Sequence, residues 1–378
     1  MATSRPGASP SYSGCNFLRQ RLLLSTLSSK PVEIKNIRHK EDEPGLKEFE
    51  VDLLKLLEKV TNGTVVEISE TGTSLLYKPG LLTGGRIEHD CCTQRSIGYY
   101  LEALVCLAPF CKKPMDAQLT GVTHHHLDPS VDAIKQATLP VLAKFLRSEG
   151  LELHVKARAV APNGGGRVRF RAPLCRSLRP AKLLNPGKVK RIRGWAFAVR
   201  VSPLVASRLV QAAKGVLLKC LPDVYIYTDH AGGGGQNPRS PGFGICLVAE
   251  TTEGTFFCAE ALSRPDGEEG AAPSVPEDVG EEAAYALLRE VYRGGCVDST
   301  NQGLAALCMC LCPPDVSKCL VGPLTPYTIQ LLRHLHHFLG ATFRVDEERR
   351  QGDSAEGCSK VRLTCVGVGF ANLAKSVS

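Results

Sequence analysis

A pattern that occurs three times along the chain limits its possible folds more than any other feature. Each copy has an amphipathic helix, a short β-branched strand, a turn and a second strand. An earlier helix candidate precedes each copy, over 17–27, 94–107 and 281–292. In the first copy a helix is expected over 46–60 and strands over 64–68 and 73–77. In the second copy the helix is expected over 131–145 and the strands over 151–157 and 167–170. In the third copy the helix is expected from residue 325 onward and the strands over 341–345 and 361–366. Asp128 and Pro129 are expected to begin the second main helix, as N-cap and first residue.

About ninety residues separate the second and third copies, and they have a different pattern. A strand is expected over 196–201, a helix over 202–218, a strand over 224–228, and a hairpin formed by 243–250 and 255–259. This order of elements predicts an inserted α/β domain. We therefore expect a disordered tail over 1–11, a repeat domain over 12–185 and 280–378, and an inserted domain over 186–279 that ends in an acidic linker.

The excess positive charge of the chain lies in one window. The formal net charge is +8, yet the seventy residues 153–222 contain sixteen Lys or Arg and no Asp or Glu, so acidic residues outnumber basic ones elsewhere. The densest part of this window contains the candidate RNA-binding residues Lys188, Lys190, Arg191 and Arg193. Such a block suits a polyanion whose counterions are released on binding. A solvated basic face and an acidic protein partner remain the alternatives.

The composition argues against several classes of protein. With 43% apolar residues the chain can bury a core. It has no run of eighteen apolar residues and no apolar N-terminal segment, so we expect no membrane span and no signal peptide. The sixteen cysteines lack the paired spacing of a zinc site, and most are expected to be buried thiols, without a metal or other cofactor. The aromatic content of 6% favours recognition of an RNA backbone over base stacking.

One turn in the second copy contains a specific motif. Arg158 is followed by Pro162 and by three consecutive glycines, Gly164, Gly165 and Gly166, between two expected strands. Glycines at such positions permit backbone angles and close approaches that a side chain would block. The segment resembles the signature of RNA 3′-terminal phosphate cyclases, and it departs from that signature only in Ala159, where the family has glycine.

Further stretches resemble the branch of this family that acts in eukaryotic ribosome assembly. They are YSGCNFLRQR (12–21), LLTGGRIEHD (81–90), DVYIYTDH (223–230), SPGFG (240–244) and YRGGCVDSTNQ (292–302). The resemblance implies the α+β cyclase/EPT-like fold, which has three repeats of a four-stranded sheet with two helices and a smaller inserted α/β domain. It also implies a nucleolar protein of the nucleus whose partners are the ribosomal RNA precursor, the snoRNP of the small-subunit processome and a nucleolar GTPase.

The chemistry of the active cyclases is incomplete in this chain. Those enzymes pass AMP through a histidine in a loop before a helix of the third repeat, and the corresponding loop here, 321–327, contains no histidine. They also carry a Gly-Gly-Gly-Gln segment in the first repeat, where this chain has Gly14, Cys15, Asn16 and Phe17. The resemblance therefore implies a catalytically inactive assembly factor. Residual cyclase activity and endonuclease activity on precursor ribosomal RNA are the alternatives.

Histidines elsewhere attract a catalytic interpretation. On the helix that begins near residue 325, helical periodicity assigns Arg333, His334 and His337 to a polar face, where they are candidate RNA contacts, and assigns His336 to the apolar side. Histidine and arginine together could also serve RNA cleavage, which is the basis of the endonuclease alternative. Residues 124–126 are three histidines in the loop before Asp128, and we expect them to be solvated and not to bind a metal.

Overall fold

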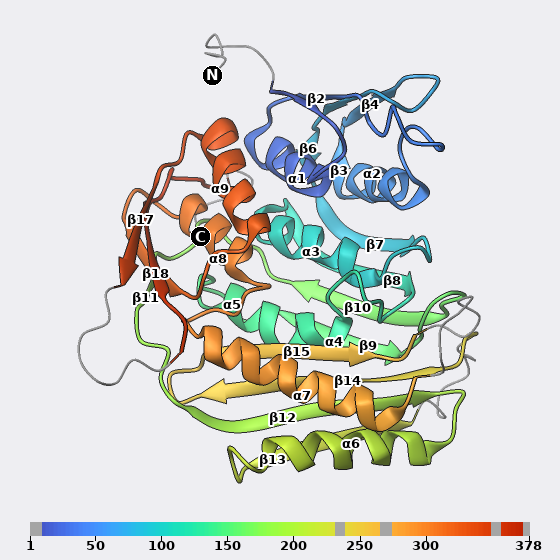
Figure 1. Cartoon of the computed structure of the whole chain (residues 1–378). Coiled ribbons are helices and arrows are strands. Elements are labelled where there is room, and N and C mark those ends of the chain that lie inside the picture. The colour runs from blue at the N-terminus through green and yellow to red at the C-terminus, as the bar shows by residue number, and fades with distance from the viewer. Residues whose placement is uncertain (1–9, 231–238, 265–273, 349–356, 373–378) are drawn as a thin grey trace.

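The computed structural model describes residues 10–230, 239–264, 274–348 and 357–372 (Figure 1). The fold is a mixed α/β fold with four four-stranded sheets and a short two-stranded sheet of β3 (Thr61–Asn62) and β6 (Leu81–Leu82). Most of the predicted tail 1–11 and the part of the acidic linker at 265–273 lie outside the described residues. None of the described helices is long and apolar enough to cross a bilayer.

Three of the sheets have the same strand order and the same pairing, which is one parallel pair followed by two antiparallel pairs. The first is β1 (Ser11–Ser13), β2 (Val32–Lys35), β5 (Leu75–Lys78) and β4 (Val65–Ile68). The second is β7 (Gly84–Asp90), β8 (Lys113–Gly121), β10 (Gly166–Ala172) and β9 (Glu152–Ala157). The third is β11 (Lys182–Leu183), β16 (Val316–Val321), β18 (Lys360–Val366) and β17 (Phe343–Glu348).

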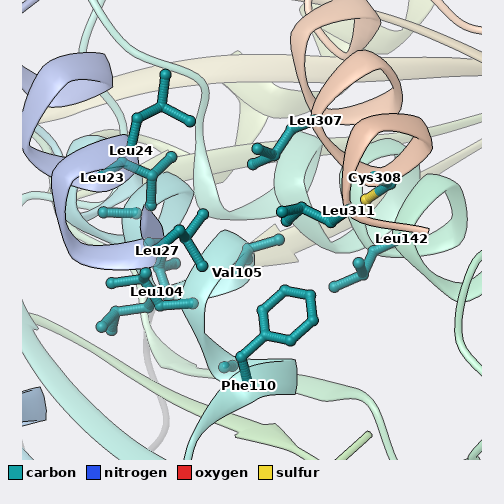
Figure 2. Close-up of a cluster of buried hydrophobic side chains, with 14 of the residues drawn as sticks. Leu23, Leu24, Leu27, Leu104, Val105, Phe110, Leu142, Leu307, Cys308 and Leu311 are labelled. Carbon is teal, nitrogen blue, oxygen red and sulfur yellow. The ribbon is translucent and has the colours of Figure 1, made fainter. Parts of the chain in front are cut away.

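The helices that accompany these three sheets share one hydrophobic core with them. They are α1 (Leu18–Ser28), α2 (Glu48–Val60), α3 (Ile97–Leu107), α4 (Val131–Ala133), which continues through a π-helical turn (Ile134–Thr138) into α5 (Leu139–Ala143), α8 (Gln302–Leu311) and α9 (Pro326–Leu339). Figure 2 shows Leu27 of α1, Val105 of α3, Leu142 of α5 and Leu311 of α8 converging on this core. Cys308 lies beside them, which confirms that this cysteine is a buried thiol.

The fourth sheet belongs to the inserted region and has its own core. Its strand order is β13 (Val224–His230), β12 (Val189–Val199), β14 (Gly242–Thr251) and β15 (Phe256–Leu262), with α6 (Pro203–Leu217) and α7 (Pro276–Arg293) packed on one face. This region lies at the bottom of Figure 1. Because β11 precedes it and α8 follows it, the insertion separates the first strand of the third sheet from the others.

One helix has a different location from the expected one. The helix predicted over 281–292 as part of the third copy is α7, and its buried residues Ala283, Ala284 and Leu287 pack in the core of the inserted region. The helix that packs against β16 and β18 of the third sheet is α8 instead. Helix α7 therefore crosses the predicted boundary at residue 280, and the exact domain limits stay a prediction.

The helix starts were predicted with mixed success. Thr325 caps α9 as expected, because its Oγ1 accepts a hydrogen bond of 3.1 Å from the backbone N–H of Thr328. The N-cap before α4 is Ser130, not Asp128, since the Ser130 Oγ accepts from the N–H of Ala133. The Asp128 carboxylate is engaged elsewhere, because it accepts hydrogen bonds from the Arg95 side chain and from the Ser96 N–H.

Candidate functional site

The junction of α1 and α9 brings together segments 14–17 and 321–327, which we expected to correspond to the nucleotide-handling segments of active cyclases. Phe17, at the start of α1, lies with its ring 6.0 Å from that of Tyr327 in the first turn of α9. The Gln20 Nε2 donates a 3.1 Å hydrogen bond to the Tyr327 carbonyl oxygen. The segments 14–17 and 321–327, which are distant in sequence, therefore form one site.

His334 is the central residue of this junction, and its predicted position on the solvent face is wrong. The side chain is fully buried. Its Nδ1 lies 2.9 Å from the Gln20 Oε1 and its Nε2 lies 3.0 Å from the Gln330 Nε2. An amide oxygen can only accept and an amide nitrogen can only donate, so Nδ1 carries the proton and Nε2 accepts. Both ring nitrogens are occupied in the neutral form.

The electrostatic surroundings favour the same neutral state. Burial lowers the pKa of His334 to about 4, and the positive charge of Arg21 and the neighbouring His337 add to the decrease. The edge of the imidazole packs on the Tyr12 ring at 5.2 Å, and the Arg21 guanidinium lies 4.5 Å from the centre of that ring. An imidazole with no free lone pair and no accessible face has no means of attacking a phosphorus atom.

The outer side of α9 has a different character. Arg333 and His337 are exposed, as predicted, and the His337 Nδ1 lies 3.4 Å from the Tyr12 hydroxyl. His336 was expected on the apolar side, but it is exposed, and its Nδ1 lies 3.3 Å from the Ala341 carbonyl oxygen. The buried stripe of α9 consists of Leu331, His334, Leu335 and Phe338 at spacings of three and four residues.

The loop before α9 is held by backbone and amide hydrogen bonds. Gln302, the first residue of α8, accepts from the Thr325 N–H at 3.2 Å and donates to the Pro323 carbonyl at 3.2 Å. The adjoining cavity has a volume of about 50 Å³ and is lined by Arg19, Glu102 and mainly apolar side chains. Binding pockets for small molecules measure roughly 300–1,000 Å³. This cavity is therefore too small for a nucleotide.

Gln20 and Gln302 are functional candidates that the sequence analysis missed. Both lie within the stretches YSGCNFLRQR and YRGGCVDSTNQ that carry the family resemblance. Both amides lie in the first turn of a helix whose later residues are mainly apolar, and an amide buried there requires partners. That position was the available signal. Their partners come from α9 and the loop before it, so the pairing could not be inferred from local sequence.

The candidate RNA-binding residues on β12 are largely paired within the fold. Lys190 and Arg191 both contact Glu250, at 2.7 and 2.6 Å, and Arg193 contacts Asp223 at 2.7 Å. Lys188 is exposed and has no ion-pair partner in the part of the chain that the structure describes. These acids come from outside the 153–222 window, so the local positive charge is smaller than the sequence suggested.

The signature loop lies where the second sheet meets the inserted region. Gly164 has φ +64°, and a Cβ on Gly166 would lie 2.5 Å from the Thr123 Cγ2, so the motif requires glycine at both positions. The loop also contacts the inserted region through the Asn163 N–H, which donates to the Ser240 Oγ at 3.0 Å. Gly165 has φ +102°, so the three glycines allow positive φ angles and close packing, and the Ala161–Pro162 peptide bond beside them is cis.

Arg158, the first residue of the signature, belongs to a buried polar network. It donates to both carboxylate oxygens of Asp132, at 3.0 and 2.8 Å, and it also contacts Asp229 of β13. His124 donates from Nε2 to the same Asp132. Burial acts to raise the pKa of Asp132, but the hydrogen bonds from His124 and Arg158 outweigh it and hold that pKa well below its ordinary value.

His124 is therefore not in a solvated loop as predicted, since its side chain is buried, whereas His126 is exposed. The network joins residues from α4, the 124–126 loop and the signature loop, and the contact with Asp229 extends it to the inserted sheet. Among the described residues, no group of three His, Cys, Asp or Glu side chains has the arrangement of a metal site.

Comparisons with known proteins place these features in a family. The family model described as RNA 3′-terminal phosphate cyclase matches residues 11–345. The chain is 55% identical over 368 residues to the RNA 3′-terminal phosphate cyclase-like protein of Bos taurus and 54% identical to that of Homo sapiens, with 97% of this chain and 98% of each relative covered. It is 41% identical over 370 residues to the rRNA processing protein rcl1 of Schizosaccharomyces pombe, with the same coverage.

Proposed function

The chain belongs to the RNA 3′-terminal phosphate cyclase family, and from this membership we propose that it acts in ribosomal RNA processing without catalysing cyclisation. The support for a processing role is the similarity to the rRNA processing protein of S. pombe and to the cyclase-like proteins of mammals. The three sheets of identical order are, in this proposal, three repeats of one unit with two helices each, and the fourth sheet is the inserted domain.

The observation that carries the inactive assignment is the state of His334. It is the histidine of α9 closest to the segment that would hold a nucleotide, and both of its nitrogens are engaged by Gln20 and Gln330 in the neutral form. The loop 321–327 supplies no alternative nucleophile of this type, and the adjoining cavity of about 50 Å³ has no room for ATP. The arrangement holds two helices together, and it leaves neither nitrogen of His334 free to accept AMP.

RNA binding in this proposal involves the basic part of the inserted domain and the outer side of α9. Lys188, Lys190, Arg191 and Arg193 line the start of β12, and Arg333 with His337 lies exposed on α9. His334 is removed from the candidate list because it is buried. An ion pair between exposed groups is weak, so the arginines near Glu250 and Asp223 can exchange a carboxylate for a phosphate at small cost.

The wider setting that we propose follows from the family branch. The protein would work in the nucleolus, within the nucleus, on the ribosomal RNA precursor, together with the snoRNP and proteins of the small-subunit processome. A nucleolar GTPase is the proposed direct protein partner. The support for this setting is the family resemblance of the stretches described above and the names of the relatives.

The proposal is tested by incubation of the protein with ATP labelled at the α-phosphate and an RNA that ends in a 3′-phosphate. We expect no covalent AMP on the protein and no cyclic phosphate on the RNA, whereas an active cyclase assayed in parallel should give both. Covalent AMP that disappears in the His334→Ala variant would overturn the proposal. Incubation with precursor ribosomal RNA alone tests the endonuclease alternative, and cleavage that is lost in Arg333→Ala would support it.

A further inference from the structure

The sheet of the inserted region has one face that is covered only in part. Helices α6 and α7 cover the other face, where Ile192 and Ala196 of β12 are buried. On the partly covered face, Cys246 and Val248 of β14 pack against Ala133 of α4. This contact covers β14 and β15 and reaches Trp195 of β12, which is partly buried against it, and Phe197 further along β12 packs against Val160. The edge strand β13 lies beyond these contacts, with Tyr225 and Tyr227 exposed.

Three aromatic rings lie side by side at the limit of the covered part, where Trp195 is partly buried and two tyrosines are exposed. The parallel register pairs Trp195 of β12 with Tyr227 of β13 and pairs Arg193 with Tyr225, so all four side chains are on the same face. Trp195 and Tyr227 are stacked with centroids 5.7 Å apart and an interplanar angle of 24°, and Tyr225 lies 4.7 Å from Tyr227 at 69°. Tyr225 and Tyr227 are 52% and 47% exposed.

Cationic side chains surround these rings. Arg193 occupies the position beside Tyr225, and the Lys214 Nζ lies 5.8 Å from the centre of the Tyr225 ring. Arg191 continues the same face of β12 toward Lys188. Two tyrosine rings that are about half exposed beside a partly buried tryptophan, with cations at their edge, are unusual on a surface that binds nothing, because burying them would be favourable.

We propose that Trp195, Tyr225 and Tyr227 form a stacking platform for the bases of single-stranded RNA, with Arg191, Arg193 and Lys214 placed for its phosphates. The inference deepens the proposed RNA-binding function and rests on it. Open sheet faces that carry aromatic rings bind single strands in this way, because every base offers a flat face to a ring. The low aromatic content had favoured backbone recognition, but composition does not reveal that three rings meet on one face.

The charge of this surface favours nucleic acid as the occupant over an apolar protein segment. The rings and their neighbours Arg193 and Lys214 belong to or adjoin the 153–222 window that has sixteen basic and no acidic residues. Asp223 already compensates Arg193, but Lys214 has no ion pair among the described residues, so an apolar protein partner would have to bury that ammonium group uncompensated, which is costly. A polyanion with flat bases satisfies the cations and the rings at once.

The chain contains a single tryptophan, so the platform has its own reporter. Titration of the protein with an oligouridylate of about 12 nucleotides, a length within the range of known single-strand sites, should quench Trp195 fluorescence and protect it from acrylamide. An abasic oligomer with the same number of phosphates should leave the fluorescence unchanged. Saturation with the oligouridylate without a change in Trp195 emission would overturn the inference.

Variants separate stacking from charge. The double variant Tyr225→Ala and Tyr227→Ala should bind the oligouridylate roughly 10- to 100-fold more weakly in fluorescence anisotropy, the range expected for loss of one to two stacked bases. The matched variant Tyr225→Phe and Tyr227→Phe keeps the rings and should bind as the wild type does. Tyr285→Ala with Tyr292→Ala, on the exposed side of α7, is the control for loss of tyrosines in general.

The outcomes also distinguish this inference from the proposed function. RNA binding that is equal in the wild type and in the folded Tyr225→Ala, Tyr227→Ala variant would overturn the platform but leave RNA binding at another surface intact. Failure of the wild-type chain to bind the oligouridylate or precursor ribosomal RNA would overturn both. Equal thermal unfolding temperatures of the variant and the wild type establish that the variant is folded.

Discussion

The α1–α9 junction and the open face of the inserted sheet hold the same kinds of side chain in opposite states. At the junction, His334 and the rings of Tyr12 and Phe17 are packed together, and the imidazole is neutral with both nitrogens bonded. On the inserted sheet, Tyr225 and Tyr227 are about half exposed beside cations. The difference teaches that residue type alone does not identify a site, because availability to a ligand depends on what the side chain already contacts.

The largest effect is expected from removal of the junction histidine. His334→Ala should lower the free energy of unfolding by about 3 kcal/mol, because it leaves a cavity and removes the partner of the buried Gln20 Oε1 and of the partly buried Gln330 Nε2. Denaturant or thermal unfolding measures this. The exposed His337→Ala should change stability by less than about 0.5 kcal/mol, and equal losses in the two variants would contradict the contrast between buried and exposed histidines.

The second prediction concerns pH. The folded state holds the pKa of His334 at about 4, below its ordinary value of 6.5, so the unfolded chain takes up the proton first as the pH falls. Stability from the neutral histidine should be complete above about pH 6.5 and decrease between there and pH 4, by roughly 2 kcal/mol after allowance for solvent screening.

The control for this pH effect is His334→Gln, which cannot titrate in this range. Its stability should start lower than that of the wild type at pH 7 and decrease less steeply toward pH 4. A parallel decrease in both proteins would assign the pH dependence to other groups, and would leave the neutral state of His334 without this support.

On the open face, charge should contribute less than the rings. Replacement of Lys188, Lys190, Arg191 and Arg193 by Ala should weaken binding of single-stranded RNA roughly 10-fold. It should also make the plot of log affinity against log salt concentration less steep, because each phosphate contact that is lost reduces the slope by about 0.7. Because Glu250 and Asp223 already pair with three of these residues, the slope should fall by less than four contacts would give. Unchanged binding would assign the basic block to a protein partner.

The smallest effect is an increase in affinity. Glu250→Gln removes the carboxylate that contacts Lys190 and Arg191, so both cations become available to phosphates. RNA should then bind about 2- to 5-fold more tightly at low salt, with a steeper salt dependence. Anisotropy titrations at two salt concentrations measure this, and Glu253→Gln, on an exposed acid in the nearby turn, is the matched control.

Local patterns predicted most of the elements. Expected helices over 46–60 and 17–27 correspond to α2 and α1, and the strand expected over 361–366 corresponds to β18. These succeeded because apolar periodicity and caps act within a few residues. The predicted location of α7 was wrong because the sequence of an amphipathic helix contains no local signal for which of two sheets the helix will cover.

The histidines of α9 show the same limit. The spacing of Leu331, Leu335 and Phe338 places His334 on the buried stripe, yet a polar residue there was assigned to the solvent face. The burial of His334 is tolerated because Gln20 of α1 satisfies one of its ring nitrogens. Gln20 lies more than three hundred residues earlier in the chain. No property of the helix itself indicates that partner.

The sequence by itself determined the family, the pattern that occurs three times, the basic window and the absence of histidine from the loop 321–327, since each of these is a matter of residue order. Only the tertiary structure decided that His334 is buried and neutral, that Arg158 of the signature loop contacts the inserted sheet through Asp229, and that Trp195, Tyr225 and Tyr227 share one face of that sheet. The physical reason is that protonation, exposure and stacking depend on contacts between distant segments, and chain folding alone creates those contacts.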